Sequence, residues 1–370
     1  MIFGAILLAI VFLIWTWLVI GVLHEGDRFR LRSPPPEAGK GPKPPRISVI
    51  VPARNEAHQI AVCIASLRGQ TILPREVIVV DDCSTDGTGA VLRGLPEDGV
   101  PVTVVDGAAP PAGWLGKAHA LHQGAARATG EWLLFTDADT IHAPETLAAA
   151  LAHAGGSNAA LVSLTGDQRA ESSWERIVQP LVFRLLDALY PLAGANGPDA
   201  GRVAANGIYM LIRRDAYDDI GGHEAFRGAV LEDVAMARAL RERGHPTAFL
   251  RGDELLQVRM YREFREIWEG WTKNLWFLLG ENAARARMVA ALVLLAGFLP
   301  GAMLWYGGAT GGLAAITAVG AEAWFRRGRK PLWALTLPLG ALLLAAMIGE
   351  SARRHLEGRE FSWKGRTYPS

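Results

Sequence analysis

The sequence predicts an α/β protein: a mostly parallel, doubly wound sheet with helices on both faces, with transmembrane helices near both ends of the chain. Three observations lead to this prediction. Half of the 370 residues are hydrophobic, which is typical of a chain that contains membrane segments. Short β-branched runs alternate with helical patterns in the middle of the chain, as in sheets whose parallel strands are joined by helices. Long apolar stretches lie on either side of this region.

The composition excludes some classes of function. The formal net charge is +1, which gives no general attraction to nucleic acid, so we expect no nucleic-acid partner. The chain has two cysteines, Cys63 and Cys83. They are too few for a disulfide framework or a cysteine metal site, and they indicate a reducing compartment.

An uncharged apolar stretch covers residues 2–23 and is long enough to cross about 30 Å of hydrocarbon. The nearest basic residues follow this stretch, at Arg28, Arg30 and Arg32. A cleaved signal peptide has its basic residues first, and loops rich in arginine stay in the cytoplasm. We therefore expect an uncleaved anchor over residues 1–24, a proline-rich linker over 25–45, and a main domain in the cytoplasm.

The main domain is predicted to occupy residues 46–255. A helical pattern at 58–68 follows the first of five strand-like runs. The five runs are 47–51, 76–80, 102–105, 132–135 and 160–164. In such sheets, ligands bind at the carboxyl ends of the strands, so the polar residues that follow these runs are the candidates for a site.

Beyond residue 255 the apolar residues adopt helical spacing. Residues 263–279 predict an amphipathic helix within an interfacial region over 256–285; it lies on the membrane or packs on the main domain, and the pattern fits both. Residues 286–350 predict two or three transmembrane helices, with spans at 288–306 and 331–349 and a glycine-rich segment between them that spans or re-enters. A tail covers 351–370.

Two acidic or basic motifs follow the first two strands. Residues 51–56 include Arg54 and Glu56, and residues 81–88 begin with Asp81 and Asp82. Strand ends with an arginine and acids can hold a nucleoside and its phosphates. The alternative is that they form ordinary strand–turn–helix junctions with a helix cap at Ser84 or Asp86.

Asp137 and Asp139 follow the strand at 132–135. Two carboxylates at the end of a buried strand suit Mg²⁺ or Mn²⁺ that also binds substrate phosphates, and the alternative is a solvated turn. Lys117 follows Gly113 and Gly116; there it neutralises a phosphate or is a surface lysine at a helix start.

Glu232 and Asp233 open an amphipathic helix. Acids favour this position through the helix dipole alone. The functional alternative is a general base that removes a proton from an acceptor hydroxyl.

Together and in this order, the motifs resemble those of the family-2 inverting glycosyltransferases over roughly residues 46–275. The resemblance implies a GT-A fold, which is Rossmann-like, and a nucleotide-sugar donor, with UDP as the expected nucleotide. It implies Asp139 as ligand of Mn²⁺ or Mg²⁺ and Asp233 as the catalytic base. The residues that it assigns to the donor are Pro52, Ala53, Arg54, Glu56, Asp81, Asp82, Lys117 and Asp137. Those that it places on the acceptor side are Asn206, Gly207, Glu232, Trp271 and Lys273.

Residues 259–261 and 270–274 are most similar to those of carotenoid- and hopanoid-associated members of the family, and more distantly to ceramide glucosyltransferases. These members imply a membrane-lipid acceptor and a multi-pass protein of the bacterial inner membrane. The chain departs from processive polysaccharide synthases because Gly270 precedes Trp271 where they carry arginine. A polysaccharide or polyprenyl-phosphate sugar transferase is therefore the second hypothesis, and a non-catalytic membrane protein on the same fold is the third.

Overall fold

The computed structural model describes residues 28–33, 44–199, 202–306, 308–325, 331–359, 361–363 and 366–368. The predicted anchor at 1–24 and linker residues 34–43 lie outside the described residues. The chain forms two compact units. The sheet unit comprises Arg28–Arg169 and Leu192–Met260, and the helical unit comprises Ala170–Pro191 and the chain from Tyr261 onward.

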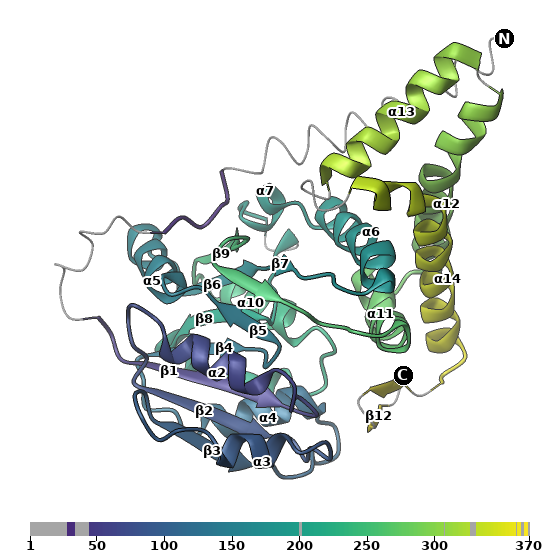
Figure 1. Ribbon diagram of the computed structural model, residues 1–370. Coiled ribbons are helices and arrows are strands. Elements are labelled where there is room, and N and C mark those ends of the chain that lie inside the picture. Colours follow the sequence, from purple (N-terminus) through teal and green to yellow (C-terminus); the bar gives the residue numbers. More distant parts are fainter. Residues whose placement is uncertain are drawn as a thin grey trace. The chain divides into compact units, whose positions relative to one another are not determined.

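A seven-stranded sheet forms the centre of the sheet unit, in the order β3-β2-β1-β4-β8-β6-β9 (Figure 1). Its strands are β1 (Ile47–Ala53), β2 (Glu76–Asp81), β3 (Val102–Asp106), β4 (Trp132–Thr136), β6 (Leu161–Thr165), β8 (Tyr209–Arg213) and β9 (Thr247–Arg251). Strand β8 pairs antiparallel with both of its neighbours, and the other neighbouring strands pair parallel. The sheet is therefore mixed, with parallel strands in the majority as predicted.

Helices cover both faces of this sheet, which confirms the doubly wound arrangement. On one face, alternate strand residues such as Val49 and Val79 pack against α2 (Ile60–Arg68) and α5 (Thr146–Ser157). On the other face, residues such as Ile50 pack against α4 (Gly116–Ala125), α8 (Arg214–Asp219) and α10 (Glu232–Glu242). The sheet unit also contains α3 (Thr88–Arg93), α7 (Leu192–Ala195) and α9 (Gly222–Ala225).

A second, three-stranded sheet lies beside the first and was not predicted. It pairs β5 (Thr140–His142) with β10 (Leu256–Val258), and β10 with β7 (Asp167–Gln168). Strands of two or three residues are too short to give an alternating sequence pattern. This small sheet matters for function because it fixes the chain directly after Asp139.

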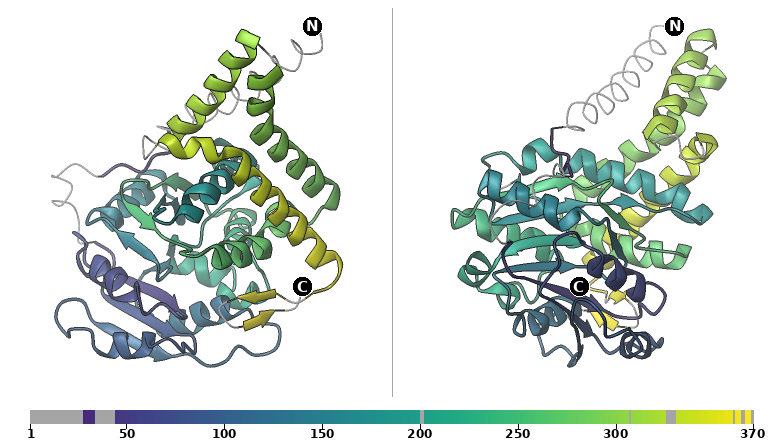
Figure 2. Two further views of the ribbon diagram at one scale, coloured as in Figure 1. Left: turned by 45° about the vertical axis from the view of Figure 1, so that its right-hand side comes forward. Right: turned by 60° about the vertical axis from the view of Figure 1, so that its left-hand side comes forward.

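Helices make up most of the helical unit (Figure 2). They are α6 (Ser173–Leu189), α11 (Phe264–Leu278), α12 (Ala283–Tyr306), α13 (Gly308–Phe325), the 3₁₀ helix η3 (Pro331–Thr336) and α14 (Leu337–Leu356), followed by the hairpin β11 (Phe361–Trp363) and β12 (Arg366–Tyr368). Helix α14 packs against α6, α11 and α12. The division of the chain differs from the predicted continuous domain at 46–255, because α6 leaves the sheet unit in the middle of that range.

Two described helices are long and apolar enough to cross a membrane by length and composition: Ala283–Trp305 and Leu332–Leu356. They cover all but one residue of each predicted span, at 288–306 and 331–349. Helix α13 does not meet this criterion, and its Glu322 is fully buried in an ion pair with Arg184 of α6. Large apolar side chains on α12 are exposed, including Leu292 and Trp305.

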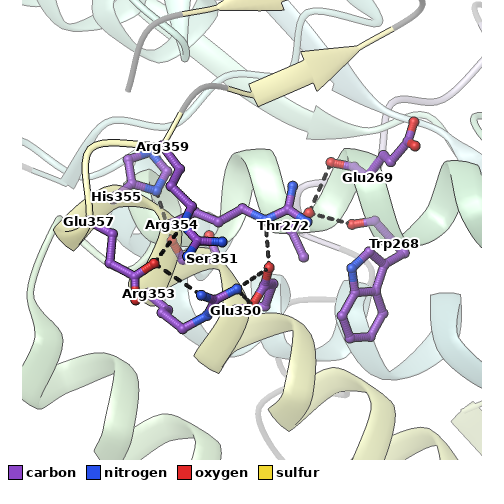
Figure 3. A network of polar contacts seen from close by, with 10 residues as sticks. All are labelled: Trp268, Glu269, Thr272, Glu350, Ser351, Arg353, Arg354, His355, Glu357 and Arg359. Carbon is purple, nitrogen blue, oxygen red and sulfur yellow. Dashed lines mark hydrogen bonds and ion pairs between the residues drawn. The ribbon is translucent and has the colours of Figure 1, made fainter.

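The last turns of α14 are strongly charged (Figure 3). Glu350 accepts hydrogen bonds from Arg353 and from Arg354, at 2.7 and 2.6 Å. Arg353 also donates to Glu357 at 3.0 Å. This ion-pair network sits at the end of an otherwise apolar helix.

Candidate active site

The polar motifs of the sequence meet at the carboxyl ends of β1, β2 and β4. These three strands are parallel neighbours, in the order β2-β1-β4. Parallel neighbours end at the same edge of a sheet, so the residues that follow them are brought together. The loops after β1 and β2 and the turn after β4 form the floor of the candidate site.

The loops after β1 and β2 are joined by direct hydrogen bonds. The Ala53 carbonyl accepts from the Asp82 N–H at 2.7 Å. The Arg54 guanidinium donates to the Asp82 carbonyl at 2.6 Å, and the Glu56 N–H donates to the Thr88 hydroxyl at 2.8 Å. Pro52 is the last but one residue of β1. The predicted nucleoside-binding residues therefore lie together in one rigid pair of loops.

Two non-glycine residues in these loops have left-handed backbone conformations: Asn55 and Cys83 both have φ 55°. Such conformations are costly and persist where surrounding contacts hold them. Here the Asn55 side-chain oxygen accepts from the Thr85 N–H at 2.8 Å, and its N–H donates to Ser84. Asp81 accepts from the Ser84 N–H at 3.0 Å and so shapes the loop. The residue at the cap position of α3 is Gly87, not Ser84 or Asp86 as the junction alternative expected.

Lys117, near the start of α4, joins the acids of two separate motifs. Its Nζ lies 2.7 Å from Asp137 Oδ1 and 3.6 Å from Glu232 Oε1. Asp137 follows β4, and Glu232 opens α10. The structure thus places the lysine motif, the Asp-Ala-Asp motif and the Glu-Asp motif around a single ammonium group.

The acids around Lys117 are partly buried, and the charged groups shift one another's pKa. Burial opposes the charge of Lys117, but Asp137 and Glu232 outweigh it and raise the pKa of the lysine. Burial raises the pKa of Glu232 to about 7, although Lys117 acts in the other direction. Burial also raises the pKa of Asp233. Carboxylates with raised pKa values in a site of this kind are suited to accept a proton near neutral pH.

Asp233 is held by the backbone on the other side of the site. Its Oδ2 accepts from the Gly207 N–H at 2.7 Å, and its Oδ1 accepts from the Val234 N–H at 2.8 Å. A Cβ atom at Gly207 would lie 3.0 Å from Lys117 Nζ, so only glycine leaves this contact undisturbed. Asn206 supports the same turn, because its N–H donates to Ser163 at 2.8 Å.

Asp139 offers hard oxygen atoms, which is the ligand type that Mg²⁺ and Mn²⁺ prefer. Its backbone carbonyl accepts from the Arg259 N–H at 3.3 Å, which ties the turn to the end of β10. Within the described residues, no group of three histidine, cysteine or acidic side chains could hold a metal ion alone. A cation at Asp139 would take further ligands from substrate oxygens, since Mg²⁺ is usually held by one or two carboxylates together with substrate phosphates.

Two residues assigned to the acceptor side, Trp271 and Lys273, belong to α11 in the helical unit. Trp271 is 2% exposed, and its indole N–H donates to Gln179 of α6 at 2.9 Å. Within that unit its contacts are those of a core residue.

The sequence interpretation missed a buried polar cluster behind the Asp137 turn. Thr136, Thr140 and His142 lie within hydrogen-bond distance of one another, and Cys63 contacts Thr140 at 3.8 Å. These polar residues are visible in the sequence beside Asp137 and Asp139. Threonine and histidine near a turn form no specific pattern, however, so nothing in the sequence indicated that they belong together.

The sequence matches known proteins over the same region. Residues 48–221 match the family described as Glycosyl transferase family 2. The 4,4'-diaponeurosporenoate glycosyltransferase of Staphylococcus aureus strain MRSA252 is 30% identical over 257 residues, which are 67% of this chain and 65% of the relative. The enzyme of strain USA300 is 29% identical over 258 residues, with the same coverage. The match thus spans 65% of the length of these curated relatives.

A solved structure supports the fold. A mannosyltransferase from Pyrobaculum calidifontis, in complex with GDP-Man and Mn²⁺, aligns over 95% of this chain and 99% of its own, with a TM-score of 0.52 and 22% identity. This likeness shows a GT-A-like fold. With the profile match and the curated relatives, it identifies the chain as a member of glycosyl transferase family 2 and a distant homologue of the diaponeurosporenoate glycosyltransferases.

Proposed function

We propose that the protein transfers a sugar from a nucleotide-sugar donor, a UDP-sugar, to a membrane lipid, and that the anomeric configuration is inverted. The acceptor is a carotenoid-, hopanoid- or ceramide-like lipid. The observation that carries this proposal is the cluster around Lys117. It brings a donor-side carboxylate, Asp137, and the acceptor-side pair Glu232 and Asp233 to one ammonium group.

The donor would lie over the loops after β1 and β2. Hydrogen bonds connect the loop that carries Arg54 and Glu56 to the loop after β2. Loops held in one conformation lose less conformational entropy when a ligand binds, which supports a nucleoside-binding role. Lys117 faces the diphosphate and offsets part of its negative charge. Until the donor binds, Asp137 holds that ammonium group at 2.7 Å.

A divalent cation, Mn²⁺ or Mg²⁺, would be held by Asp139 together with diphosphate oxygens. When bound, it supplies electrostatic stabilisation of the leaving nucleoside diphosphate. The similar mannosyltransferase was solved with GDP-Man and Mn²⁺, which supports the same class of ligands here.

Asp233 acts as the base. It takes the proton of the acceptor hydroxyl while the acceptor oxygen forms its bond to the anomeric carbon. The bond from that carbon to the diphosphate oxygen breaks on the opposite face, and the nucleoside diphosphate leaves. The raised pKa of Asp233 supports this role because it makes the carboxylate a better proton acceptor.

The membrane part of the proposal is supported by the helical unit. Its two candidate spans and the exposed apolar side chains of α12 suit a lipid environment. An active site facing the cytoplasm at the inner membrane of a bacterium would reach a lipid head without extracting the lipid.

The test uses detergent-purified protein, a panel of UDP- and GDP-sugars, Mn²⁺ or Mg²⁺, and total membrane lipid as acceptor. We expect one nucleotide to be released in a lipid-dependent reaction that stops with chelator and yields a glycolipid. Nucleotide release that yields no glycolipid with any of the lipid fractions would contradict the proposed acceptor class. No turnover of any donor would contradict the transferase proposal.

Asp233→Asn should lower the transfer rate by about 10²- to 10⁴-fold, because removal of a general base has effects of this size. Donor binding should survive, since the amide oxygen still accepts the Gly207 N–H. Asp98→Asn, at an acid whose side chain is 88% exposed, is the control and should keep full activity. Normal turnover by Asp233→Asn would refute the assignment of the base.

A further inference from the structure

Three polar side chains lie fully buried behind the turn that carries Asp137 and Asp139. Thr136 ends β4, and Thr140 and His142 begin and end β5. Thr136 and Thr140 are each 1% exposed, and His142 is 4% exposed. Buried polar groups are costly unless they are hydrogen-bonded, so their partners determine what the cluster does.

Each threonine hydroxyl donates to a backbone carbonyl of the active site. Thr140 Oγ1 donates to the Asp137 carbonyl at 2.7 Å. Thr136 Oγ1 donates to the Ile208 carbonyl at 2.7 Å. Ile208 directly follows Gly207, whose N–H holds Asp233. One threonine therefore fixes the donor-side acid, and the other fixes the turn that holds the base.

These two bonds determine the protonation of His142. A hydroxyl has one hydrogen, and both hydroxyls use theirs on carbonyls. His142 Nε2 lies 3.2 Å from Thr136 Oγ1 and 3.1 Å from Thr140 Oγ1, so it must be the donor to both. Burial keeps the ring neutral by lowering its pKa to about 3. The ring is therefore the neutral tautomer with its proton on Nε2.

We propose that Thr136, Thr140 and His142 are positioning residues that set the separation between Asp137 and Asp233. A single imidazole N–H joins the two hydroxyls, and each hydroxyl holds the backbone of one reacting side. The proposal rests on the proposed transferase function for its kinetic test. Loss of the cluster would shift one acid relative to the other, and a displacement of about 1 Å can cost about 10²-fold in rate.

The kinetic test replaces each threonine by its isostere, Thr136→Val and Thr140→Val. We expect kcat of transfer to fall by about 10- to 100-fold, with KM for the donor changed less than about threefold, because the site is distorted and not blocked. The matched control is Thr146→Val. Thr146 is also fully buried in the same unit, and its hydroxyl lies 2.8 Å from the Ala143 carbonyl and 2.5 Å from the Leu255 carbonyl. The Thr146→Val variant should lose about as much thermal stability as the other two valine variants, and it should keep the kcat of the wild type.

Histidine variants separate positioning from packing. His142→Gln keeps an amide N–H near the place of Nε2, and His142→Leu removes it. We expect the glutamine variant to keep at least about tenfold more activity than the leucine variant, because only glutamine can still donate to both hydroxyls. Equal activities of the two variants, or equal kcat losses for Thr136→Val and Thr146→Val, would overturn the proposal.

The tautomer gives a readout that needs no turnover. In protein labelled with ¹⁵N-histidine, the signals lost in His142→Gln should show a protonated Nε2 and a bare Nδ1. A proton on Nδ1 would overturn the proposal even if transfer is confirmed. If no donor turns over, the proposed function has failed, and this measurement still decides whether the cluster is arranged as stated.

Discussion

Burial of Glu232 in the folded protein disfavours its negative charge, so the free energy of unfolding depends on pH. Its pKa is raised from 4.5 to about 7 in the folded protein. Between these pH values the folded state keeps the proton and the unfolded state loses it, so stability falls as the pH rises from about 4.5 to about 7. Above about pH 7, Glu232 is charged in both the folded and the unfolded state, so its destabilising effect no longer changes with pH.

Glu232→Gln should therefore stabilise the protein above pH 7, by about 1–3 kcal/mol, and the difference from wild type should vanish toward pH 4.5. Thermal unfolding in detergent across this pH range measures the difference. Glu254→Gln, at a side chain that is 81% exposed, should give no such trend. A glutamine variant that is less stable than wild type at pH 8 would show that the attraction of Lys117 outweighs the burial.

At this scale, the sequence singled out charged residues that the fold brings together, but not how they are held. Asp137, Lys117 and Asp233 stand out because charged residues at strand and helix ends are visible in the sequence. The N–H of Gly207 that holds Asp233 is not visible, because backbone donors carry no sequence signal. The Thr136 cluster stayed hidden for a related reason: its role depends on contact with Ile208, 72 positions away.

Among the elements, five of the seven strands of the main sheet were predicted to within two residues, because runs of buried apolar side chains mark them. The five predicted runs correspond to β1, β2, β3, β4 and β6. Helix α6 shows the limit of such patterns. Its sequence has an apolar face and a capping box at Ser172 and Glu175, which define a helix but not the unit to which it belongs. Membership follows from contacts with α14, far along the chain.

The ion pair between Arg184 of α6 and Glu322 of α13 fixes these two helices within the helical unit. Glu322 is fully buried and the Arg184 side chain is 11% exposed. Removing one partner leaves the other charge buried, so Arg184→Leu should lower stability by about 3–5 kcal/mol. Replacing both with leucine should recover most of that loss, because the apolar pair leaves no buried charge.

Thermal unfolding in detergent measures these variants. The control is Arg265→Leu, which breaks an exposed pair with Glu269 on α11, where the arginine side chain is 85% exposed. Exposed pairs of this kind contribute about 0.3–0.5 kcal/mol. An Arg184→Leu variant that is no less stable than Arg265→Leu would mean that the α6–α13 pair does not hold the helices together.

For the whole molecule, the proposed membrane location depends on two helices whose length and composition suit a membrane span. Among the described residues, 28% of the apolar window in the candidate span Ala283–Trp305 is buried, which leaves much of the helix open to contact with lipid. Trp305, at its end, is 82% exposed. An exposed tryptophan at the end of an apolar helix is typical of a residue in contact with lipid near the membrane interface.

If α12 is embedded in lipid, Trp305 should be quenched by brominated acyl chains after reconstitution of the full-length protein into vesicles. Replacing it with phenylalanine should lower the quenched fraction of the tryptophan fluorescence. The control is Trp276→Phe, because Trp276 is 8% exposed and stacks on His355 inside the helical unit. Its loss should leave the quenched component intact. Equal changes in both variants would mean that α12 does not contact lipid, and the exposed apolar face would then need a protein partner, since an uncovered face of this size favours association.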